Sequence, residues 1–288
     1  MTEQATRFRL DIAYQGTDFN GWGRQPDQRT VQGTLEAALA TIFRRAGEPP
    51  TLTVAGRTDA GVHATGQVAH VDLDPGQVAL LRKPHGKRPP LEPADALARR
   101  VNGVLGPVPD VVVLRASEAP AGFDARFSAL WRRYEYRVAD RAALRDPLQR
   151  HRTAWVASTL DVDGMDLAAH GLLGLHDFAS YCKAREGATT IRTLQAFSWR
   201  RDDDGVLVGE VGADAFCHSM VRALVGACVE VGEGKLTPGD LVRLRDEQRR
   251  TSAFKVMPAR GLTLLEVGYP PDAELATRAE QTRGMRTL

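Results

Sequence analysis

One order of elements occurs twice along the chain, and this repetition restricts the fold more than any other feature of the sequence. In the first half, alternating apolar residues predict a strand over 7–14, and apolar residues at helical spacing predict a helix over 31–46. The first half continues with two strands near 52–54 and 69–73, a helix over 93–104 and a strand over 110–115. Strand, helix, strand, strand, helix, strand is the order of the ferredoxin-like βαββαβ fold.

The second half repeats this order. Its expected elements are a strand at 134–138, a helix at about 162–175, strands at about 192–200 and 205–212, a helix at 216–231 and a strand at 262–269. Asp202–Gly205 has the composition of a hairpin turn, and Thr237 before Pro238 is typical of a helix N-terminus. We therefore expect an α+β protein with two tandem ferredoxin-like, RRM-like units and antiparallel sheets.

The periodicity breaks at Ala119–Gly122, which predicts a boundary between two domains. We expect one domain over 1–118, a second over 119–270, and a polar, partly helical tail over 271–288.

Composition excludes several classes of protein. The chain has 288 residues, of which 43% are hydrophobic and 26% charged, so it can form a core and is neither disordered nor fibrous. No apolar run approaches the ~20 residues of a membrane span, and the N-terminal residues do not resemble a signal peptide. Cys182, Cys217 and Cys228 form no C-x-x-C pair, so we expect no disulfide framework, no thiolate zinc site and a reducing, cytoplasmic location without a membrane partner.

Basic residues cluster although the net charge is only +2. The stretch 82–100 carries six basic and two acidic side chains, and 82–93 is a basic, proline-rich loop. The stretch 126–152 carries eight arginines with four aromatic residues among them. Basic residues interleaved with aromatic residues are typical of proteins that bind a polyanion with stackable bases. A solvated arginine-rich face is the alternative interpretation.

The segment Gly56–His63, with sequence GRTDAGVH, is the strongest candidate for chemistry. It lies between two predicted strands, and its glycines permit a tight loop that projects Asp59 and Arg57. Taken alone, the same spacing also fits an ordinary Asp/Gly turn.

This segment resembles the signature loop of the TruA family of tRNA pseudouridine synthases. Six further segments resemble family motifs in the family's order over about 7–270: Tyr14–Trp22, Thr30–Leu39, Phe123–Ser128, Arg132–Tyr136, Ala215–Gly232 and Pro258–Leu262. The chain departs from the family pattern at Gly23, Ser219 and Arg260, and the loop 82–93 resembles an insertion.

The resemblance implies the fold of the pseudouridine synthase core and an isomerase that converts uridine to pseudouridine at tRNA positions 38–40. It implies a homodimer that binds tRNA and uses no cofactor and no metal. By resemblance, Asp59 is the catalytic nucleophile, Arg222 is its ion-pair partner, and Tyr134 stacks on the flipped base and can transfer a proton at C5. The resemblance also suggests these substrate contacts: Tyr134, Arg57, Thr58, His63, Arg126 and Leu262.

Several alternatives stay open at this stage. Arg222 also fits a surface arginine on an amphipathic helix, and Tyr134 also fits a core position on a strand. A metal site at His63, His70 and Asp72 lacks a diagnostic spacing. Two other functions are an RNA-binding module without chemistry and a carboxylate hydrolase. The hydrolase would pair Asp59 with Glu36 or Asp124.

Overall fold

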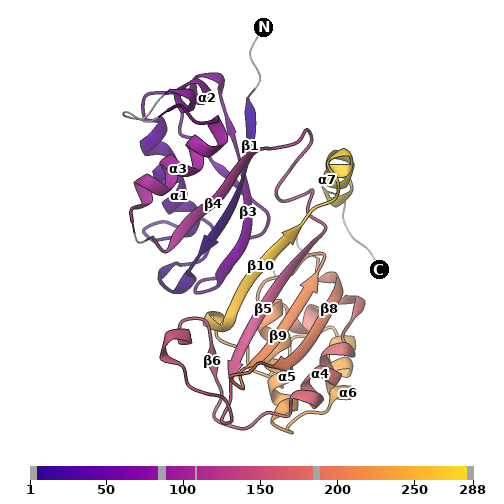
Figure 1. The fold of residues 1–288 in the computed structure, drawn as a ribbon. Helices are drawn as coiled ribbons and strands as arrows, with labels where there is room; N and C mark the ends of the chain where they lie inside the picture. Colours follow the sequence, from indigo (N-terminus) through magenta and orange to yellow (C-terminus); the bar gives the residue numbers. More distant parts are fainter. Residues whose placement is uncertain (1–4, 84–88, 108, 184–188, 284–288) are drawn as a thin grey trace. The chain divides into compact units, whose positions relative to one another are not determined.

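The computed structural model describes residues 5–83, 89–107, 109–183 and 189–283. These residues pack as two compact units, one formed by 5–130 together with 269–283 and the other formed by 131–268 (Figure 1). Each unit is described by itself.

The first unit contains an antiparallel sheet in the order β4–β1–β3–β2. Its strands are β1 (Thr6–Tyr14), β2 (Leu52–Val54), β3 (His63–Leu73) and β4 (Val111–Glu118). Its helices are α1 (Val31–Phe43), α2 (Pro75–Arg82), α3 (Pro93–Leu105) and α7 (Leu275–Arg283), with short 3-10 helices at Gly16–Asp18 and Asp272–Glu274. α3 packs on β4, and α1 packs on α3. The strand order 4-1-3-2 is that of the ferredoxin-like fold, as the sequence predicts.

Side-chain capping contacts explain where α1 and α2 begin. The side chain of Thr30 accepts a hydrogen bond from the backbone N–H of Gly33 at the start of α1. A capping box formed by Asp74 and Gln77 starts α2, a helix of 8 residues that the apolar pattern does not reveal.

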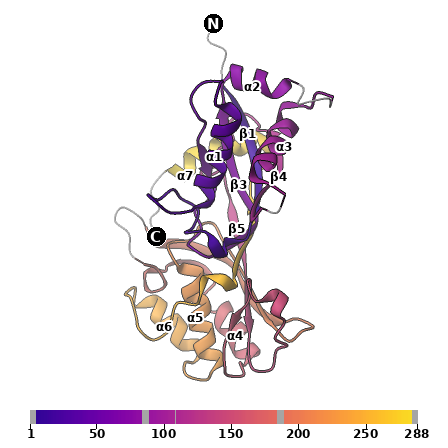
Figure 2. The ribbon, with the colours of Figure 1, turned by 90° about the vertical axis from the view of Figure 1, so that its left-hand side faces the viewer.

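The second unit contains a sheet in the order β10–β5–β9–β8–β7, antiparallel throughout, with β6 added in parallel to β5. Its strands are β5 (Trp131–Ala139), β6 (Ala154–Trp155), β7 (Gly174–Asp177), β8 (Ile191–Arg201), β9 (Leu207–Ala213) and β10 (Leu262–Gly268). Its helices are α4 (Val162–His170), α5 (Met220–Gly232) and α6 (Pro238–Asp246), with 3-10 helices at Pro147–Gln149, Ala179–Tyr181 and Ala259–Gly261. The helices lie on one face of this sheet (Figure 2). Without β6 and β7, the strand order again corresponds to 4-1-3-2, so both predicted ferredoxin-like units are confirmed.

Two predicted helices of this unit have different bounds. The helix expected over 162–175 ends at His170, and Gly174 with φ +111° then starts the edge strand β7. The helix expected from 216 starts only at Met220, because Ser219 adopts a left-handed conformation with φ +64°. Residues 214–219 therefore form a loop.

Segments assigned by the sequence to a second domain and a tail pack within the first unit. The backbone N–H of Ala125 donates to Nδ1 of His70, which attaches 119–130 to β3. The Ser128 hydroxyl donates to the backbone oxygen of Leu275, and Leu275 and Ala279 are buried on α7.

The sequence predicts no disulfide framework, but Cys182 and Cys217 form a disulfide, with their Cα atoms 5.8 Å apart. The loop that follows β7 and the loop before α5 bring the two residues together, and a separation of 35 residues in the sequence gives no sign of this pairing. Cys228 is buried as a free thiol. Within the part of the chain that the structure describes, no helix is both long and apolar enough to cross a membrane.

Candidate active site

The residues 55–62, called the Asp59 loop below, connect β2 to β3 in the first unit. Within this loop the Arg57 side chain is exposed, Thr58 is buried and Asp59 is half-buried. The chain reverses direction after Asp59, where the backbone N–H of Val62 donates to the Asp59 oxygen and Gly61 has φ +79°. The loop thus presents a half-buried carboxylate directly after a buried threonine and two residues after an exposed arginine.

Thr58 anchors the Asp59 loop to the sheet. Its hydroxyl lies 2.8 Å from the Tyr14 hydroxyl at the end of β1. The side-chain amide of Gln67 donates to the Tyr14 hydroxyl at 3.2 Å and to the Gly56 oxygen at 3.0 Å. Burial raises the pKa of Tyr14 to about 12, so its phenol stays protonated in this network.

The turn after β1 packs directly on the Asp59 loop. The backbone N–H of Gly61 donates to the Phe19 oxygen, and that of Trp22 donates to the Thr58 oxygen. A Cβ atom on Gly16 would lie 2.0 Å from the Val62 oxygen, so only glycine permits this approach. The motif Tyr14–Trp22 therefore shapes the loop that carries Asp59.

His63 supports the same loop. Its ring is buried, and its Nδ1 accepts a hydrogen bond of 2.9 Å from the backbone N–H of Gly16. His70 accepts from Ala125, and Asp72 forms an ion pair with Arg7 at 2.7 Å. Among the described residues, no group of three His, Cys, Asp or Glu side chains is placed to hold a metal ion.

The carboxylates considered as hydrolytic partners of Asp59 have structural roles. Glu36 is buried on α1 and accepts a hydrogen bond from the backbone N–H of Leu52 at 2.9 Å. Asp124 accepts from the backbone N–H groups of Arg126 and Phe127. Both carboxylates are therefore occupied in holding the backbone, which does not support a hydrolytic pair.

Two predicted RNA contacts of the first unit are exposed cations. A Cβ atom on Gly23 would lie 3.4 Å from Nε of Arg57, an ordinary van der Waals contact, so the family departure at Gly23 lies beside this arginine. Arg126 lies over the ring of Phe127 at 5.0 Å from the ring centroid, and Arg283 lies over the same ring.

Tyr134 lies on β5, the second strand of the second unit's sheet, between Val211 of β9 and Leu264 of β10. It is 8% exposed. Phe216 meets its ring edge-on, with centroids 5.2 Å apart and planes at 89°. The sequence placed Phe216 in a motif but assigned it no role.

Tyr136 and Leu262 are core residues of this sheet and pair with each other across β5 and β10. The Tyr136 hydroxyl donates to the Pro258 oxygen at 2.7 Å. A Cβ atom on Gly261 would lie 2.5 Å from the Tyr136 ring, so the backbone of the segment 258–262 packs directly against this tyrosine.

Arg222 is held at the N-terminus of α5 and is not a surface arginine. It is half-buried, and its Nη2 donates to the Ser219 hydroxyl oxygen at 3.0 Å. Its Nη1 lies 3.4 Å from the Met257 oxygen, and the Met257 backbone N–H donates to the Arg222 oxygen. These contacts fix the direction of the guanidinium group.

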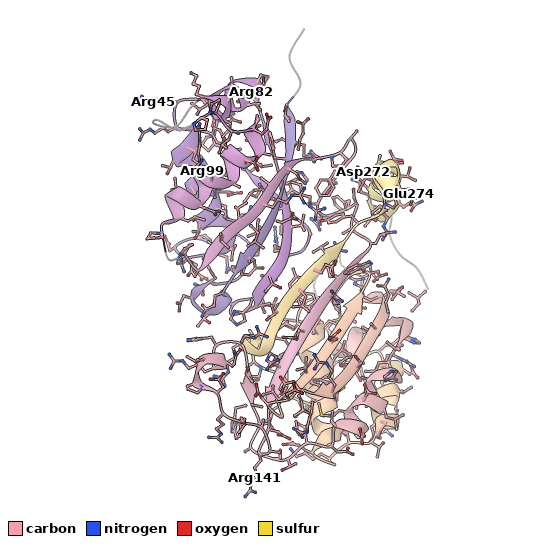
Figure 3. All side chains as sticks on the ribbon, viewed as in Figure 1. Arg45, Arg82, Arg99, Arg141, Asp272 and Glu274 are labelled. Atoms are coloured by element: carbon pink, nitrogen blue, oxygen red, sulfur yellow. A yellow bond between two sulfur atoms is a disulfide. The ribbon has the colours of Figure 1, made fainter. Side chains whose placement is uncertain are left out.

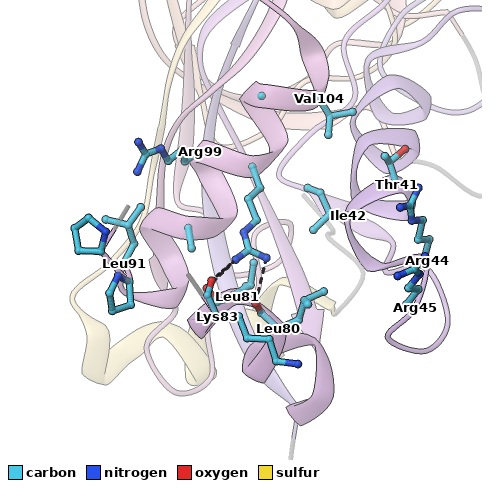
Figure 4. A pocket seen from close by; sticks show the side chains of 15 residues that line it. Thr41, Ile42, Arg44, Arg45, Leu80, Leu81, Lys83, Leu91, Arg99 and Val104 are labelled. Carbon is cyan, nitrogen blue, oxygen red and sulfur yellow. Dashed lines mark hydrogen bonds between the residues drawn. The ribbon is translucent and has the colours of Figure 1, made fainter. Parts of the chain in front are cut away.

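A groove of about 730 Å³ lies among α1, α2 and α3 of the first unit. Its lining includes aliphatic side chains and five basic residues, namely Arg44, Arg45, Lys83, Arg99 and Arg100, and no carboxylate (Figure 4). The Arg100 guanidinium donates to the backbone oxygens of Leu80, Leu81 and Lys83 and so caps the C-terminus of α2. Arg45 and Arg99 point outward from this side of the unit (Figure 3). We call this surface the basic groove. Lys87 and Arg88 of the predicted basic loop lie outside the described residues.

The predicted site residues thus fall into two groups. Arg57, Thr58, Asp59 and His63 share the Asp59 loop or its end in the first unit, where Arg126 lies on the segment 119–130. Tyr134, Arg222 and Leu262 lie in the second unit. Sequence reasoning missed the supports beneath these groups, namely Tyr14, Gln67, Phe216 and Ser219.

The sequence of this chain is similar to those of known tRNA pseudouridine synthases. A family described as tRNA pseudouridine synthase matches residues 168–270. A tRNA pseudouridine synthase A of Leifsonia xyli is 86% identical to this chain over 288 residues, which is 100% of both chains. A tRNA pseudouridine synthase A of Streptomyces griseus is 51% identical and matches 100% of this chain and 98% of its own length. A tRNA pseudouridine synthase A of Frankia casuarinae is 52% identical, with 99% and 97% covered.

Proposed function

We propose that this chain, which belongs to the tRNA pseudouridine synthase A family, isomerises uridine to pseudouridine in tRNA. The observation that carries the proposal is the Asp59 loop, whose carboxylate follows a threonine anchored 2.8 Å from the Tyr14 hydroxyl. By resemblance, the targets are uridines at positions 38–40 in the anticodon stem-loop. The reaction breaks the C1′–N1 glycosidic bond, turns the base and joins C1′ to C5, while a proton leaves C5 and N1 gains one. Nothing is oxidised or lost, so the chemistry itself requires neither a redox cofactor nor a metal.

Asp59 is the proposed nucleophile. Its carboxylate adds covalently to the target nucleotide and stabilises the intermediate while the base turns. Arg222 is the proposed ion-pair partner that keeps Asp59 negatively charged when the base excludes water. The contacts of Arg222 with Ser219 and Met257 support this role, because they orient the guanidinium before substrate binds.

Tyr134 is the proposed platform for the flipped base. A uridine stacked in an RNA stem must leave the stack before it can react, at a cost of a few kcal/mol. Stacking on an aromatic ring returns about 1–3 kcal/mol per base. The edge-on contact with Phe216 supports this role, since it fixes the plane of the Tyr134 ring.

Exposed cations are the proposed contacts with RNA phosphates. Arg57 lies beside Asp59 in the sequence, Arg126 lies on the segment 119–130, and the basic groove adds further positive charge. For Thr58, His63 and Leu262, which are buried, we propose that they shape the substrate site from beneath. We also propose a homodimer in the cytoplasm, where its tRNA substrate is found.

Pseudouridine mapping of unmodified tRNA tests the proposal. Asp59→Asn should abolish product, because the amide is not a nucleophile, while the variant still binds tRNA. Asp203→Asn is the matched control, since Asp203 is exposed at the β8–β9 turn, and it should react like the wild type. Pseudouridine formation by Asp59→Asn at the wild-type rate would contradict the mechanism. Unchanged tRNA with the wild type would favour an RNA-binding module, and release of free uracil would favour a hydrolase.

A further inference from the structure

The loop 214–219, between β9 and α5, contacts both proposed catalytic residues of the second unit. Phe216 from this loop packs edge-on against Tyr134. Ser219, the last residue of the loop, accepts a hydrogen bond from Arg222. A displacement of this loop therefore changes the surroundings of the stacking platform and of the guanidinium group together.

Several contacts hold this loop in place. The Asp214 carboxylate accepts from the backbone N–H groups of Thr193 at 3.1 Å and Ala215 at 2.6 Å. The Arg132 guanidinium donates to the Asp214 backbone oxygen at 2.7 Å. These three contacts fix the start of the loop, next to β9.

The end of the loop near α5 is held by the segment Cys182–Lys183. The backbone N–H of Lys183 donates to the His218 oxygen at 3.0 Å, and the Cys182–Cys217 disulfide joins the same two segments covalently. Cys182 follows the 3-10 helix Ala179–Tyr181, which the Tyr181 hydroxyl ties to the Leu241 oxygen at 2.7 Å. The disulfide thus attaches the loop to a well-anchored part of the unit.

We infer that the Cys182–Cys217 disulfide positions two side chains of the proposed active site in a redox-dependent way. It fixes the position of Tyr134 through Phe216 and that of Arg222 through Ser219. This inference rests on the proposed function. When the disulfide is closed, the loop 214–219 is held at both ends, and the two catalytic side chains are kept in the reacting arrangement. When it is open, the covalent link between the two segments is lost, while the backbone hydrogen bond from Lys183 to His218 can persist.

A dithiol in solution supplies the reductant for this step. Its thiolate attacks one sulfur of the disulfide and forms a mixed disulfide, and its second thiol then closes on the first. Two electrons and two protons pass to the protein, which leaves Cys182 and Cys217 as thiols and the dithiol as a cyclic disulfide. Cys182 is buried, whereas Cys217 is half-buried and precedes the exposed His218, so the dithiol would approach the disulfide from the Cys217 side. Burial raises the pKa of the Cys228 thiol to about 12, so Cys228 does not take part in the exchange.

Opening the disulfide should lower kcat and change KM for tRNA much less. A misplacement of about 1 Å at a reacting centre can reduce the rate by as much as ~100-fold. Because Asp214 still holds the start of the loop, we expect a smaller loss, of about 5-fold. The exposed cations proposed to bind RNA phosphates lie outside this loop, and Tyr134 keeps its ring, so affinity for tRNA should change less than the rate.

The experiment compares the full-length protein after treatment with glutathione disulfide and after treatment with dithiothreitol. Mass spectrometry of thiol-alkylated protein should count one free thiol in the oxidised form and three in the reduced form. Pseudouridine formation under saturating tRNA should be about 5-fold slower for the reduced form. Cys217→Ser and Cys182→Ser should each show the slow rate and no response to dithiothreitol, whereas Cys228→Ala should respond like the wild type.

A second variant separates positioning from stability. Phe216→Leu keeps an apolar side chain but loses the edge-on ring, and it should lower kcat and reduce the response to dithiothreitol, because both changes act through the same loop. Three free thiols after oxidation, or equal kcat for both forms of an active wild type, would overturn the inference and leave the proposed function standing. A lower melting temperature with unchanged kcat would show a merely structural disulfide and would also overturn it. Absence of pseudouridine with the wild type in both forms would overturn the proposed function itself.

Discussion

The hydroxyl groups of Tyr14 and Thr58 lie 2.8 Å apart, which joins the end of the first strand to the residue before Asp59. The two residues are 44 positions apart in the sequence, yet the hydrogen bond is buried. Together with the packing of the turn after β1, this hydrogen bond makes the segment Tyr14–Trp22 the surface on which the Asp59 loop rests.

Tyr14→Phe should slow the reaction without abolishing it. Removing the hydroxyl leaves Thr58 without this partner, and an unsatisfied buried polar group costs about 1–3 kcal/mol. The loosened loop should reduce kcat by about 10-fold, because positioning of Asp59 suffers. Tyr269→Phe is the control, since its hydroxyl bonds the Ala125 oxygen at 2.7 Å and it should keep the wild-type kcat. Equal kcat for Tyr14→Phe and the wild type, measured by pseudouridine formation, would show that this hydrogen bond does not position Asp59.

Substitutions of Tyr134 should separate stacking from proton transfer. Tyr134→Phe keeps the ring and its contact with Phe216 but lacks the hydroxyl, so it should bind tRNA normally and react at least ~100-fold more slowly. Tyr134→Leu also loses stacking, and its complex with tRNA should be weaker by up to about 1–3 kcal/mol. Binding by fluorescence anisotropy and single-turnover rates distinguish the two effects. A wild-type rate for Tyr134→Phe would remove the hydroxyl from the mechanism.

Much of the fold could be predicted because the apolar residues recur with clear periods. In β1, the alternating apolar residues Phe8, Leu10 and Ile12, on which the predicted strand over 7–14 depends, are all buried. The order of elements then leads to the ferredoxin-like sheet in each unit. The elements that were not predicted have no such periodic pattern. The helix α2 has 8 residues, too few for a pattern to repeat, and its start depends on the capping box at Asp74.

In the candidate site, too, some residues could be predicted from the sequence and others could not. Asp59 and its neighbours stand in one continuous segment, so the family resemblance identifies them together. Their supports come from distant segments: Gln67 reaches back across the sheet, and Phe216 meets Tyr134 only after the chain folds. Ser219 has a positive φ, which non-glycine residues rarely adopt, so the true start of α5 could not be predicted. The pairing of Cys182 with Cys217 likewise depends on tertiary contact alone.

Binding of tRNA should weaken with salt in proportion to the phosphates contacted by the basic residues. Each phosphate neutralised on a duplex contributes about −0.9 to the slope of log K against log salt concentration. Neutralising Arg82 and Lys83 at the edge of the basic groove, together with Lys87 and Arg88, should make this slope less steep. Lys235→Gln is the control, because Lys235 pairs with Glu230 at 3.3 Å, and its slope should equal that of the wild type. An unchanged slope after the four substitutions would exclude this loop from the RNA site.

The neutral form of His70 should make the first unit sensitive to acid. Burial, and then the nearby positive charge of Arg7, lower the pKa of His70 from its usual 6.5, although Asp124 and Asp72 oppose the shift. Its Nδ1 accepts the Ala125 N–H at 3.0 Å, which requires an unprotonated nitrogen. Because the unfolded chain binds a proton more readily, the contribution of His70 to stability is full above pH 6.5 and is lost as pH falls toward the lower folded-state pKa.

His70→Asn tests this directly, since the asparagine oxygen can replace Nδ1 as acceptor but does not titrate. In urea unfolding between pH 7.5 and 5, the free energy of unfolding of the wild type should fall more steeply than that of the variant. The difference in slope is at most about 1.4 kcal/mol per pH unit for one proton. The pKa of Asp72 is also lowered, mainly by its hydrogen bond from Arg7, and that bond is common to both proteins; only its smaller electrostatic interaction with His70 differs between them. Parallel slopes for the wild type and His70→Asn would mean that His70 does not gain its proton on unfolding.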